Sequence, residues 1–146
     1  AGRGDLVVEL IGDGTHLARE LVRSVFELVG AENVALVTDA MAADGAYRLG
    51  SLDVTVSEGV ARLTEGGAIA GGTAHLLDVL RTTVAGGVSL VDAVRAASTT
   101  PATVLGDPRI GTLEVGRRAD VVATDPDLPV VQVLRAGRVV HPPTEH

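Results

Sequence analysis

The 146-residue chain is 46% hydrophobic but has one phenylalanine, one tyrosine and no tryptophan, so its composition predicts an aliphatic core of the α/β type. A net charge of −7 disfavours binding to nucleic acids or acidic membranes, and the absence of cysteine excludes disulfides, zinc fingers and thiol nucleophiles. Because no apolar run approaches the length of a membrane span, we expect a soluble, cytoplasmic protein.

The first third of the chain predicts a strand–helix–strand unit. Residues 6–11 are an apolar run rich in branched side chains that ends in a glycine-containing turn over 12–14. A helical stripe over 17–29 stops at Gly30, and residues 33–37 form a second apolar run. Two strands joined by one helix predict a parallel pair with a right-handed crossover.

The middle of the chain predicts a loop, a small hairpin and then helices. Residues 42–50 have loop composition, and the runs 53–56 and 60–63 predict a hairpin. The segment GGAIAGG (66–72) has too much glycine to favour a regular element. Capping patterns and apolar spacing then predict three helices, at 73–85, 89–97 and 100–106.

The last third of the chain has a different sequence pattern, in which glycine and proline separate short strand-like runs. We expect strands at 111–116, 120–124, 130–134 and 138–140, and a loose end over 142–146. This divides the chain into residues 1–107, an α/β part, and residues 108–146, a β appendage. Two parallel strands alone leave both sheet edges unpaired, so the α/β part matches the last two strand–helix units of a barrel whose earlier strands are absent.

Asp39 is the strongest candidate for chemistry. It follows the second buried strand, at the end where α/β proteins place ligands and barrels place active sites. A carboxylate buried there would be paired, bound to a metal or shifted in pKa, and could move a proton from water to a leaving amine. The alternative is an aspartate that caps the following loop.

His16 follows the first strand in the same way, so we expect it on the same rim as Asp39. It could donate to a substrate oxygen or bind a metal, or it could be an exposed loop histidine. The glycine-rich segment leads into a helix, a geometry that offers backbone amides to an anion or carbonyl, although it fits no phosphate-loop pattern. His75, on the first turn of that helix, is expected at the surface. The four histidines form no metal-binding motif.

Five segments, in order, resemble the C-terminal portion of the N-acetylglucosamine-6-phosphate deacetylases, a family of the amidohydrolase superfamily. They are ELIGDGTH (9–16), LVTDAMAADG (36–45), AIAGGT (68–73), AVRAASTTPATVLG (93–106) and GTLEVGRRADVVATD (111–125). The last block is common across the superfamily, whereas the first three are more specific to the deacetylases. The family continues its A-G loop differently from the Gly72-Thr73-Ala74-His75 seen here.

The resemblance implies the C-terminal part of a metal-dependent TIM barrel, its last two β/α units with an inserted β-hairpin, plus strands of a small β-sandwich. Asp39 would be the catalytic acid/base, beside the metal. His16 and the loop Ile69, Ala70 and Gly71 would bind the amino-sugar phosphate. The main metal ligands of the family lie on earlier strands, so a zinc or iron-type divalent metal is expected in the full enzyme and none in this chain alone.

Three functions stay open at this stage. The chain could be a fragment of a deacetylase that converts N-acetylglucosamine 6-phosphate to glucosamine 6-phosphate and acetate, inactive by itself. It could be a non-catalytic binding or assembly domain with an idle rim, or part of an amidohydrolase of another amide. The expected partners are the missing N-terminal half of the barrel and further copies of the chain.

Overall fold

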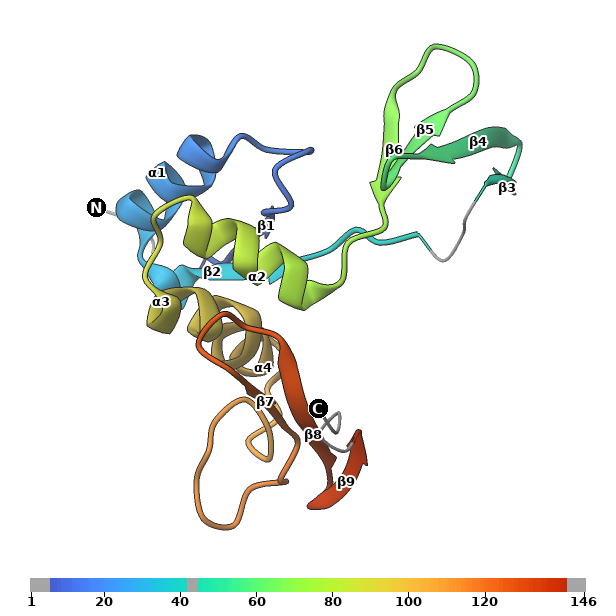
Figure 1. Ribbon diagram of the computed structural model, residues 1–146. Coiled ribbons are helices and arrows are strands. Elements are labelled where there is room, and N and C mark those ends of the chain that lie inside the picture. Colours follow the sequence, from blue (N-terminus) through green and yellow to red (C-terminus); the bar gives the residue numbers. More distant parts are fainter. Residues whose placement is uncertain (1–5, 42–44, 142–146) are drawn as a thin grey trace.

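The computed structural model describes residues 6–41 and 45–141. The expected loop over residues 42–44 and the expected loose end over 142–146 lie outside these ranges. The described residues form a two-stranded, a four-stranded and a three-stranded sheet. The helices and the two-stranded sheet lie between the two larger sheets, which project in opposite directions (Figure 1).

The expected strand–helix–strand unit is confirmed. Strands β1 (Val8–Ile11) and β2 (Val34–Val37) pair in parallel, with Leu10 opposite Leu36. Helix α1 (Arg19–Val29) connects them and ends at Gly30, which adopts a φ of 81°. A short 3₁₀ turn over Ala31–Asn33 leads into β2. The positive φ explains why glycine ends this helix, since it has no Cβ to clash.

One face of this small sheet carries the core. Leu10, Val34 and Leu36 pack there among side chains of the helices, which include Val22, Phe26, Val79, Leu80, Ala93 and Ala96. On the opposite face Glu9 is exposed, and Ile11 and Val37 are only half-buried. Within 6–41 and 45–141 no third strand pairs with either edge of β1–β2. The predicted open edges are therefore present in the described chain.

The expected hairpin is part of a larger antiparallel sheet. Its strands, in order, are β3 (Ala46–Leu49), β4 (Leu52–Ser57), β5 (Val60–Leu63) and β6 (Ile69–Gly72). The predictions of a loop over 46–49 and of no regular element over 66–72 are wrong. Glycine weakens a strand through lost side-chain packing, but Gly71 and Gly72 pair with Ala61 and Val60, and close backbone approach favours glycine there.

The three predicted helices become α2 (Leu76–Ala85), α3 (Leu90–Val94) and α4 (Thr100–Leu105). The Ser89 side chain accepts from the backbone N–H of Asp92 at 3.1 Å, which confirms the predicted cap of α3. The predicted short helix from Thr100 is confirmed as α4, which ends before Gly106, and a wider π-helical turn over Arg95–Thr99 joins α3 to it. Pro101 offers no N–H to a regular helix, and the wider turn accommodates it.

The C-terminal sheet consists of β7 (Val121–Thr124), β8 (Val130–Arg135) and β9 (Arg138–His141), paired antiparallel in chain order. Three of the four predicted strands are thus confirmed. The prediction over 111–116 is wrong, because this segment is part of an irregular loop. The Gly111 carbonyl of this segment accepts a hydrogen bond from the hydroxyl of Thr99 at 2.8 Å.

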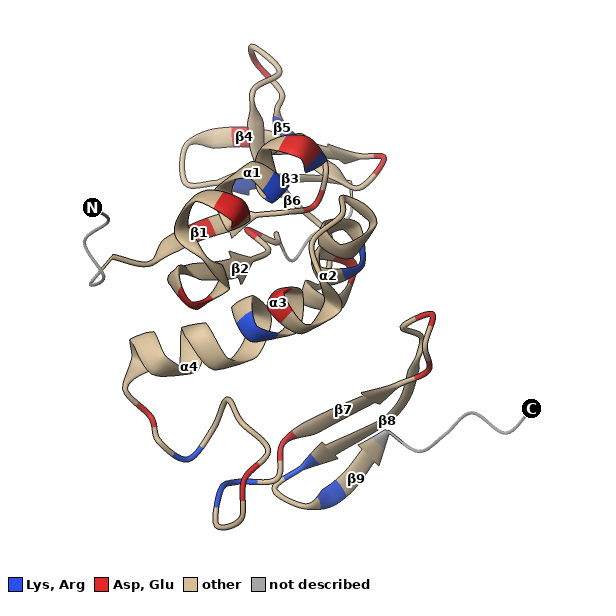
Figure 2. Ribbon diagram, turned by 90° about the vertical axis from the view of Figure 1, so that its left-hand side faces the viewer, with Lys and Arg blue, Asp and Glu red and all other residues tan. Residues whose placement is uncertain are grey.

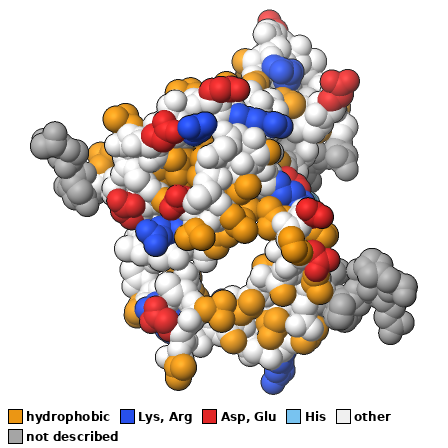
Figure 3. All heavy atoms as spheres, turned by 60° about the vertical axis from the view of Figure 1, so that its left-hand side comes forward, with side chains coloured by type: hydrophobic (Ala, Val, Ile, Leu, Met, Phe, Trp, Pro, Cys, Tyr) orange, Lys and Arg blue, Asp and Glu red, His pale blue; other side chains and the backbone are white. Residues whose placement is uncertain are grey.

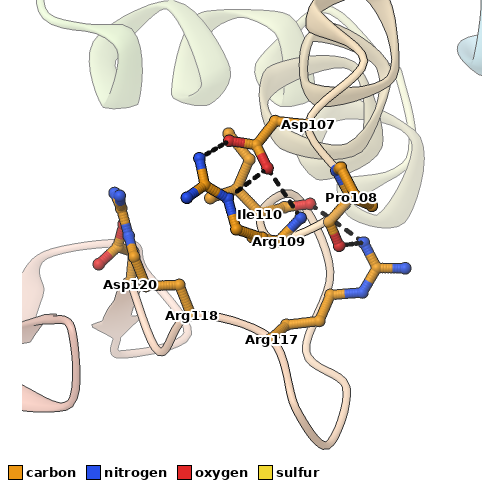
Figure 4. Close-up of polar contacts among 7 residues, drawn as sticks. All are labelled: Asp107, Pro108, Arg109, Ile110, Arg117, Arg118 and Asp120. Carbon is orange, nitrogen blue, oxygen red and sulfur yellow. Dashed lines mark hydrogen bonds and ion pairs between the residues drawn. The ribbon is translucent and has the colours of Figure 1, made fainter.

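Arginine side chains hold this loop together (Figure 4). Arg109 binds both carboxylate oxygens of Asp107, at 2.9 and 2.7 Å, and keeps the pKa of that carboxyl far below its usual range. Arg117 reaches back to the carbonyl of Pro108 at 2.6 Å, and Arg118 pairs with Asp120. The segment between α4 and β7 therefore keeps a defined path without secondary structure.

A cavity of about 420 Å³ lies between the helical segment at Val94 and Ser98 and the loop over 110–121. Hydrophobic side chains gather around a hollow on this side of the molecule (Figure 3). Acidic and basic residues are interspersed along the loop between α4 and β7 (Figure 2). Among the helices of the described ranges, none combines the length and the apolar character that crossing a membrane requires.

Candidate functional site

The carboxyl ends of β1 and β2 bring Asp13, His16 and Asp39 together. His16 Nε2 lies 3.7 Å from Asp39 Oδ2, although the two residues belong to loops that follow different strands. The prediction that they share one rim is confirmed. The reason is topological, because parallel neighbouring strands end at the same edge of a sheet.

Asp13 organises the loop that carries His16. Its Oδ1 accepts hydrogen bonds from the backbone N–H groups of Thr15 and His16, both at 2.9 Å, which is a local aspartate turn. Its Oδ2 lies 2.8 Å from Nδ1 of His16. Burial raises the pKa of Asp13, but these hydrogen bonds outweigh it and leave the pKa below its ordinary value. Asp13 is therefore a fixed anion, with its side chain only 7% exposed.

The second ring nitrogen of His16 is a buried polar atom directed at Asp39. Nε2 has no hydrogen-bond partner among the described residues, and the His16 side chain is 14% exposed. A buried polar atom without a partner costs free energy, on the order of 1–3 kcal/mol. A ligand that binds beside the half-exposed Asp39 carboxylate would supply this nitrogen with a hydrogen-bond partner.

Asp39 adopts a backbone conformation that few residues tolerate. Its φ is 47°, in the left-handed region, and its side chain is 54% exposed. Aspartate and asparagine enter this region more readily than other residues with a Cβ. The turn directs the carboxylate towards His16, and the Thr38 hydroxyl accepts from the N–H of Ala40 at 3.2 Å behind it.

Strand β6 fixes the loop that carries Asp39. The N–H of Gly72 donates to the Asp39 carbonyl at 3.0 Å, and the N–H of Met41 donates to the Gly72 carbonyl at 2.7 Å. In Figure 1 the chain leaving β2 runs beside the end of β6. Gly71 has a φ of 146°, and a Cβ there would lie 2.6 Å from Cγ of Met41. Only glycine allows this close approach.

The predicted substrate loop is therefore only partly at the site. Gly71 lies against the Asp39 backbone, whereas Ile69 and Ala70 come earlier on β6, where Ile69 pairs with Arg62 of β5. His75 is exposed and forms the N-cap of α2. From the sequence, Asp13 is predicted only as part of the turn over 12–14. The signal for its role was the Asp-Gly-x-His spacing, which is typical of an aspartate turn that reaches the residue three positions on.

The described residues do not form a complete metal site. No group of three histidine, cysteine, aspartate or glutamate side chains within 6–41 and 45–141 is arranged to hold an ion. At the site only His16 Nε2 and Asp39 point at a common space, and Asp13 is already occupied by the His16 ring and two amides. What these side chains can do by themselves is transfer a proton and bind a polar ligand.

The cavity at 110–121 is a weaker candidate, since none of Asp13, His16 and Asp39 lines it. Its charged groups are paired with each other, Arg117 with Glu114 and Arg118 with Asp120.

Known proteins are similar to this chain over almost its whole length. A family model described as the amidohydrolase family matches residues 2–141. A putative N-acetylgalactosamine-6-phosphate deacetylase of Escherichia coli K12 is 38% identical over 90% of this chain and 81% of its own length. The N-acetylglucosamine-6-phosphate deacetylase of Vibrio furnissii is 35% identical over 91% of this chain.

Among solved structures, N-acetyl-D-glucosamine-6-phosphate deacetylase of Mycobacterium smegmatis aligns with a TM-score of 0.87 and 44% identity. That structure is an aspartate-to-alanine variant in complex with N-acetyl-D-glucosamine-6-phosphate, and the alignment covers 94% of this chain. The chain spans 34% of the V. furnissii enzyme and 38% of the M. smegmatis one. The match over 2–141 assigns the chain to the amidohydrolase family.

Proposed function

We propose that this chain supplies the C-terminal part of the active site of a deacetylase acting on N-acetylated amino-sugar 6-phosphates. The reaction would convert N-acetylglucosamine 6-phosphate to glucosamine 6-phosphate and acetate. The observation that carries the proposal is the approach of His16 Nε2 to Asp39 Oδ2, 3.7 Å apart at the ends of two parallel strands. The relatives named above, at 35–44% identity, support the substrate class.

The proposal includes the architecture. Strands β1 and β2 with their helices would be the last two β/α units of a TIM barrel within residues 1–107, and β3–β6 would be an insertion. Strands β7–β9, within residues 108–146, would belong to a small β-sandwich. A TIM barrel needs about 250 residues, and the open edges of β1–β2 are where its remaining strands would pair.

Asp39 is assigned the proton transfers. Its carboxylate takes a proton from the attacking water as the water oxygen bonds to the acetyl carbon. It then gives that proton to the sugar nitrogen as the carbon–nitrogen bond breaks, so acetate and the free amine result. His16 would hold the sugar, bordered by the backbone of Ile69, Ala70 and Gly71. Members of this family generally use a divalent metal, whose ligands would come from outside the described residues.

The identity of the sugar is best tested directly, because relatives named for N-acetylglucosamine and for N-acetylgalactosamine both match. The 44% identity to the M. smegmatis enzyme favours the former. Acetate release from both 6-phosphates, and from an unphosphorylated control sugar, separates the two. An enzyme that releases acetate from neither phosphate would contradict the proposal.

The first measurement is the mass of the polypeptide that carries this segment in its source cells, followed by its turnover. In an active preparation we expect Asp39→Asn to lower kcat by about 10²–10⁴-fold, the usual contribution of general acid–base catalysis. Asparagine tolerates the φ of 47°, so the loop should persist. Asp53→Asn, at an exposed residue of β4, is the charge-matched control. Equal activities of the two variants would remove Asp39 from this role.

A binding or assembly domain is the second candidate, and the open edges of β1–β2 favour it. If the 146-residue chain is the whole product, we expect it to be inactive and to self-associate through those edges. Sedimentation velocity tests this. A compact monomer at micromolar concentration would contradict the association, and turnover by that monomer would contradict the need for further barrel strands.

A further inference from the structure

We propose that Asp13 is a positioning residue that keeps the proton of neutral His16 on Nδ1, so that Nε2 accepts a hydrogen bond from a sugar hydroxyl and does not donate to Asp39. This deepens the proposed function and rests on it for its catalytic consequence. The assignment of the proton itself rests only on the geometry around His16.

Asp13 acts as a hydrogen-bond acceptor towards the His16 ring. An ionised carboxylate has no hydrogen to donate, so the 2.8 Å contact between Asp13 Oδ2 and His16 Nδ1 requires the hydrogen to be on the ring nitrogen. The carboxylate cannot turn away, because Oδ1 is held by the amides of Thr15 and His16. The lowered pKa of Asp13 keeps it in this acceptor form.

The chemistry of the imidazole ring then determines what Nε2 can do. A neutral imidazole carries one N–H, and with that hydrogen on Nδ1 the other nitrogen is an acceptor. Nε2 is buried and finds no donor among the described residues. The Asp39 Oδ2 atom is 3.7 Å from Nε2, which is beyond a hydrogen bond. Two acceptors face each other here, and a hydroxyl group of a ligand can satisfy Nε2.

The position of the His16 hydrogen also affects Asp39. If neutral His16 carried its hydrogen on Nε2, a small closure of the 3.7 Å separation would let that N–H donate to the Asp39 carboxylate and reduce its ability to take a proton from water. The Asp13 contact prevents this arrangement. His16 thereby contributes sugar binding without engaging the catalytic base, and this division of roles depends on Asp13, which acts through the His16 ring.

Asp13→Asn tests the assignment with little change in shape. The asparagine Oδ1 can keep both backbone amides, which places its NH₂ group against Nδ1 of His16 and forces the ring hydrogen onto Nε2. Long-range ¹H–¹⁵N spectra of the ring nitrogens report the tautomer directly. The histidines at 75, 141 and 146 serve as internal references, and His16→Gln identifies the resonance. Asp53→Asn is the control of equal charge change.

We expect neutral His16 with the hydrogen on Nδ1 in the wild-type chain and in Asp53→Asn, and on Nε2 in Asp13→Asn. A wild-type ring with its hydrogen on Nε2 overturns the proposal. So does a folded Asp13→Asn chain that keeps the wild-type tautomer. If Asp13→Asn fails to fold, the wild-type spectrum alone decides.

Kinetics of the active enzyme provide the second readout. A reversed tautomer engages Asp39, so Asp13→Asn should lower kcat by at least about 10-fold and raise KM less, as expected when an aspartate that sets a histidine tautomer is replaced. An unchanged kcat with a reversed tautomer overturns the catalytic consequence. Absence of turnover in the wild-type enzyme refutes the proposed function instead, and the spectra still decide the tautomer.

Discussion

Replacement of Gly71 by alanine tests whether β6 holds the Asp39 loop in place. The added Cβ would lie 2.6 Å from Met41 Cγ and 2.9 Å from the Asp39 carbonyl oxygen. The second of these atoms belongs to the backbone and cannot rotate away. The loop and the strand must therefore separate, which weakens the hydrogen bonds between Gly72 and both Asp39 and Met41.

The expected cost has two parts. An L-residue with a Cβ at a φ of 146° costs about 1–3 kcal/mol in conformational strain. Overpacking of a fitted contact adds about 1–3 kcal/mol. We therefore expect Gly71→Ala to lower the free energy of unfolding by about 3 kcal/mol, a large share of the 5–15 kcal/mol typical of a domain.

Gly67→Ala provides the matched control. Gly67 also has a positive φ, 67°, but a Cβ there meets no atom within 4 Å. Only the conformational cost of about 1–2 kcal/mol should appear. Urea unfolding of the wild-type chain and of both variants separates the two costs. Equal losses for both variants would refute the reasoning, because they would mean that β6 does not press against the Asp39 loop.

The two buried threonines should respond in opposite ways to removal of their hydroxyl. Thr83 Oγ1 has no partner among the described residues, so Thr83→Val should leave the free energy of unfolding unchanged or raise it by about 1 kcal/mol. Thr100→Val breaks a 3.0 Å hydrogen bond to the Ala31 carbonyl and should lower the free energy of unfolding by about 1–2 kcal/mol. A larger loss for Thr83→Val in urea would be evidence against the packing around α2. Asp13 predicts a pH dependence: its folded pKa lies below the ordinary 3.8, so its stabilising contribution is complete above pH 3.8 and is lost as the pH falls through the folded pKa. Asp13→Asn should flatten the stability profile in that acid window relative to Asp53→Asn, and parallel profiles would contradict the assignment.

The sequence predicted the elements whose signals are local. Apolar periodicity predicts the βαβ unit. The glycine at position 30 predicts the end of α1, and the Ser89 cap predicts the start of α3. Strand β6 was missed because glycine disfavours strands, and its pairing depends on contact with β5 and with the loop after β2. The segment 111–116 alternates like a strand but pairs with no strand among the described residues, and its Gly111 carbonyl accepts instead from the hydroxyl of Thr99. Intrinsic strand propensity is a local property, so it does not predict contacts between residues that are far apart in the sequence.

Some residues of the candidate site could be predicted from the sequence, and others could not. Asp39 and His16 could be proposed from their positions after two parallel strands, since topology alone places them on one rim. The role of Asp13 needed the structure, because the same Asp-Gly sequence also favours an ordinary turn or cap. The part played by Gly71 and Gly72 required β6 to be placed beside a loop about thirty residues earlier in the chain.

The site depends on backbone contacts more than on its own side chains. Asp39 is held in a left-handed turn at φ 47° by hydrogen bonds to β6, while His16 is held by the turn that Asp13 forms after β1. Their relative position therefore depends on two short parallel strands whose outer edges pair with no other strand in the described part of the chain. Any partner that pairs with those edges would stabilise the register of β1 against β2, and with it the 3.7 Å approach of His16 to Asp39. Completion of the sheet would thus also fix the position of Asp39 relative to His16.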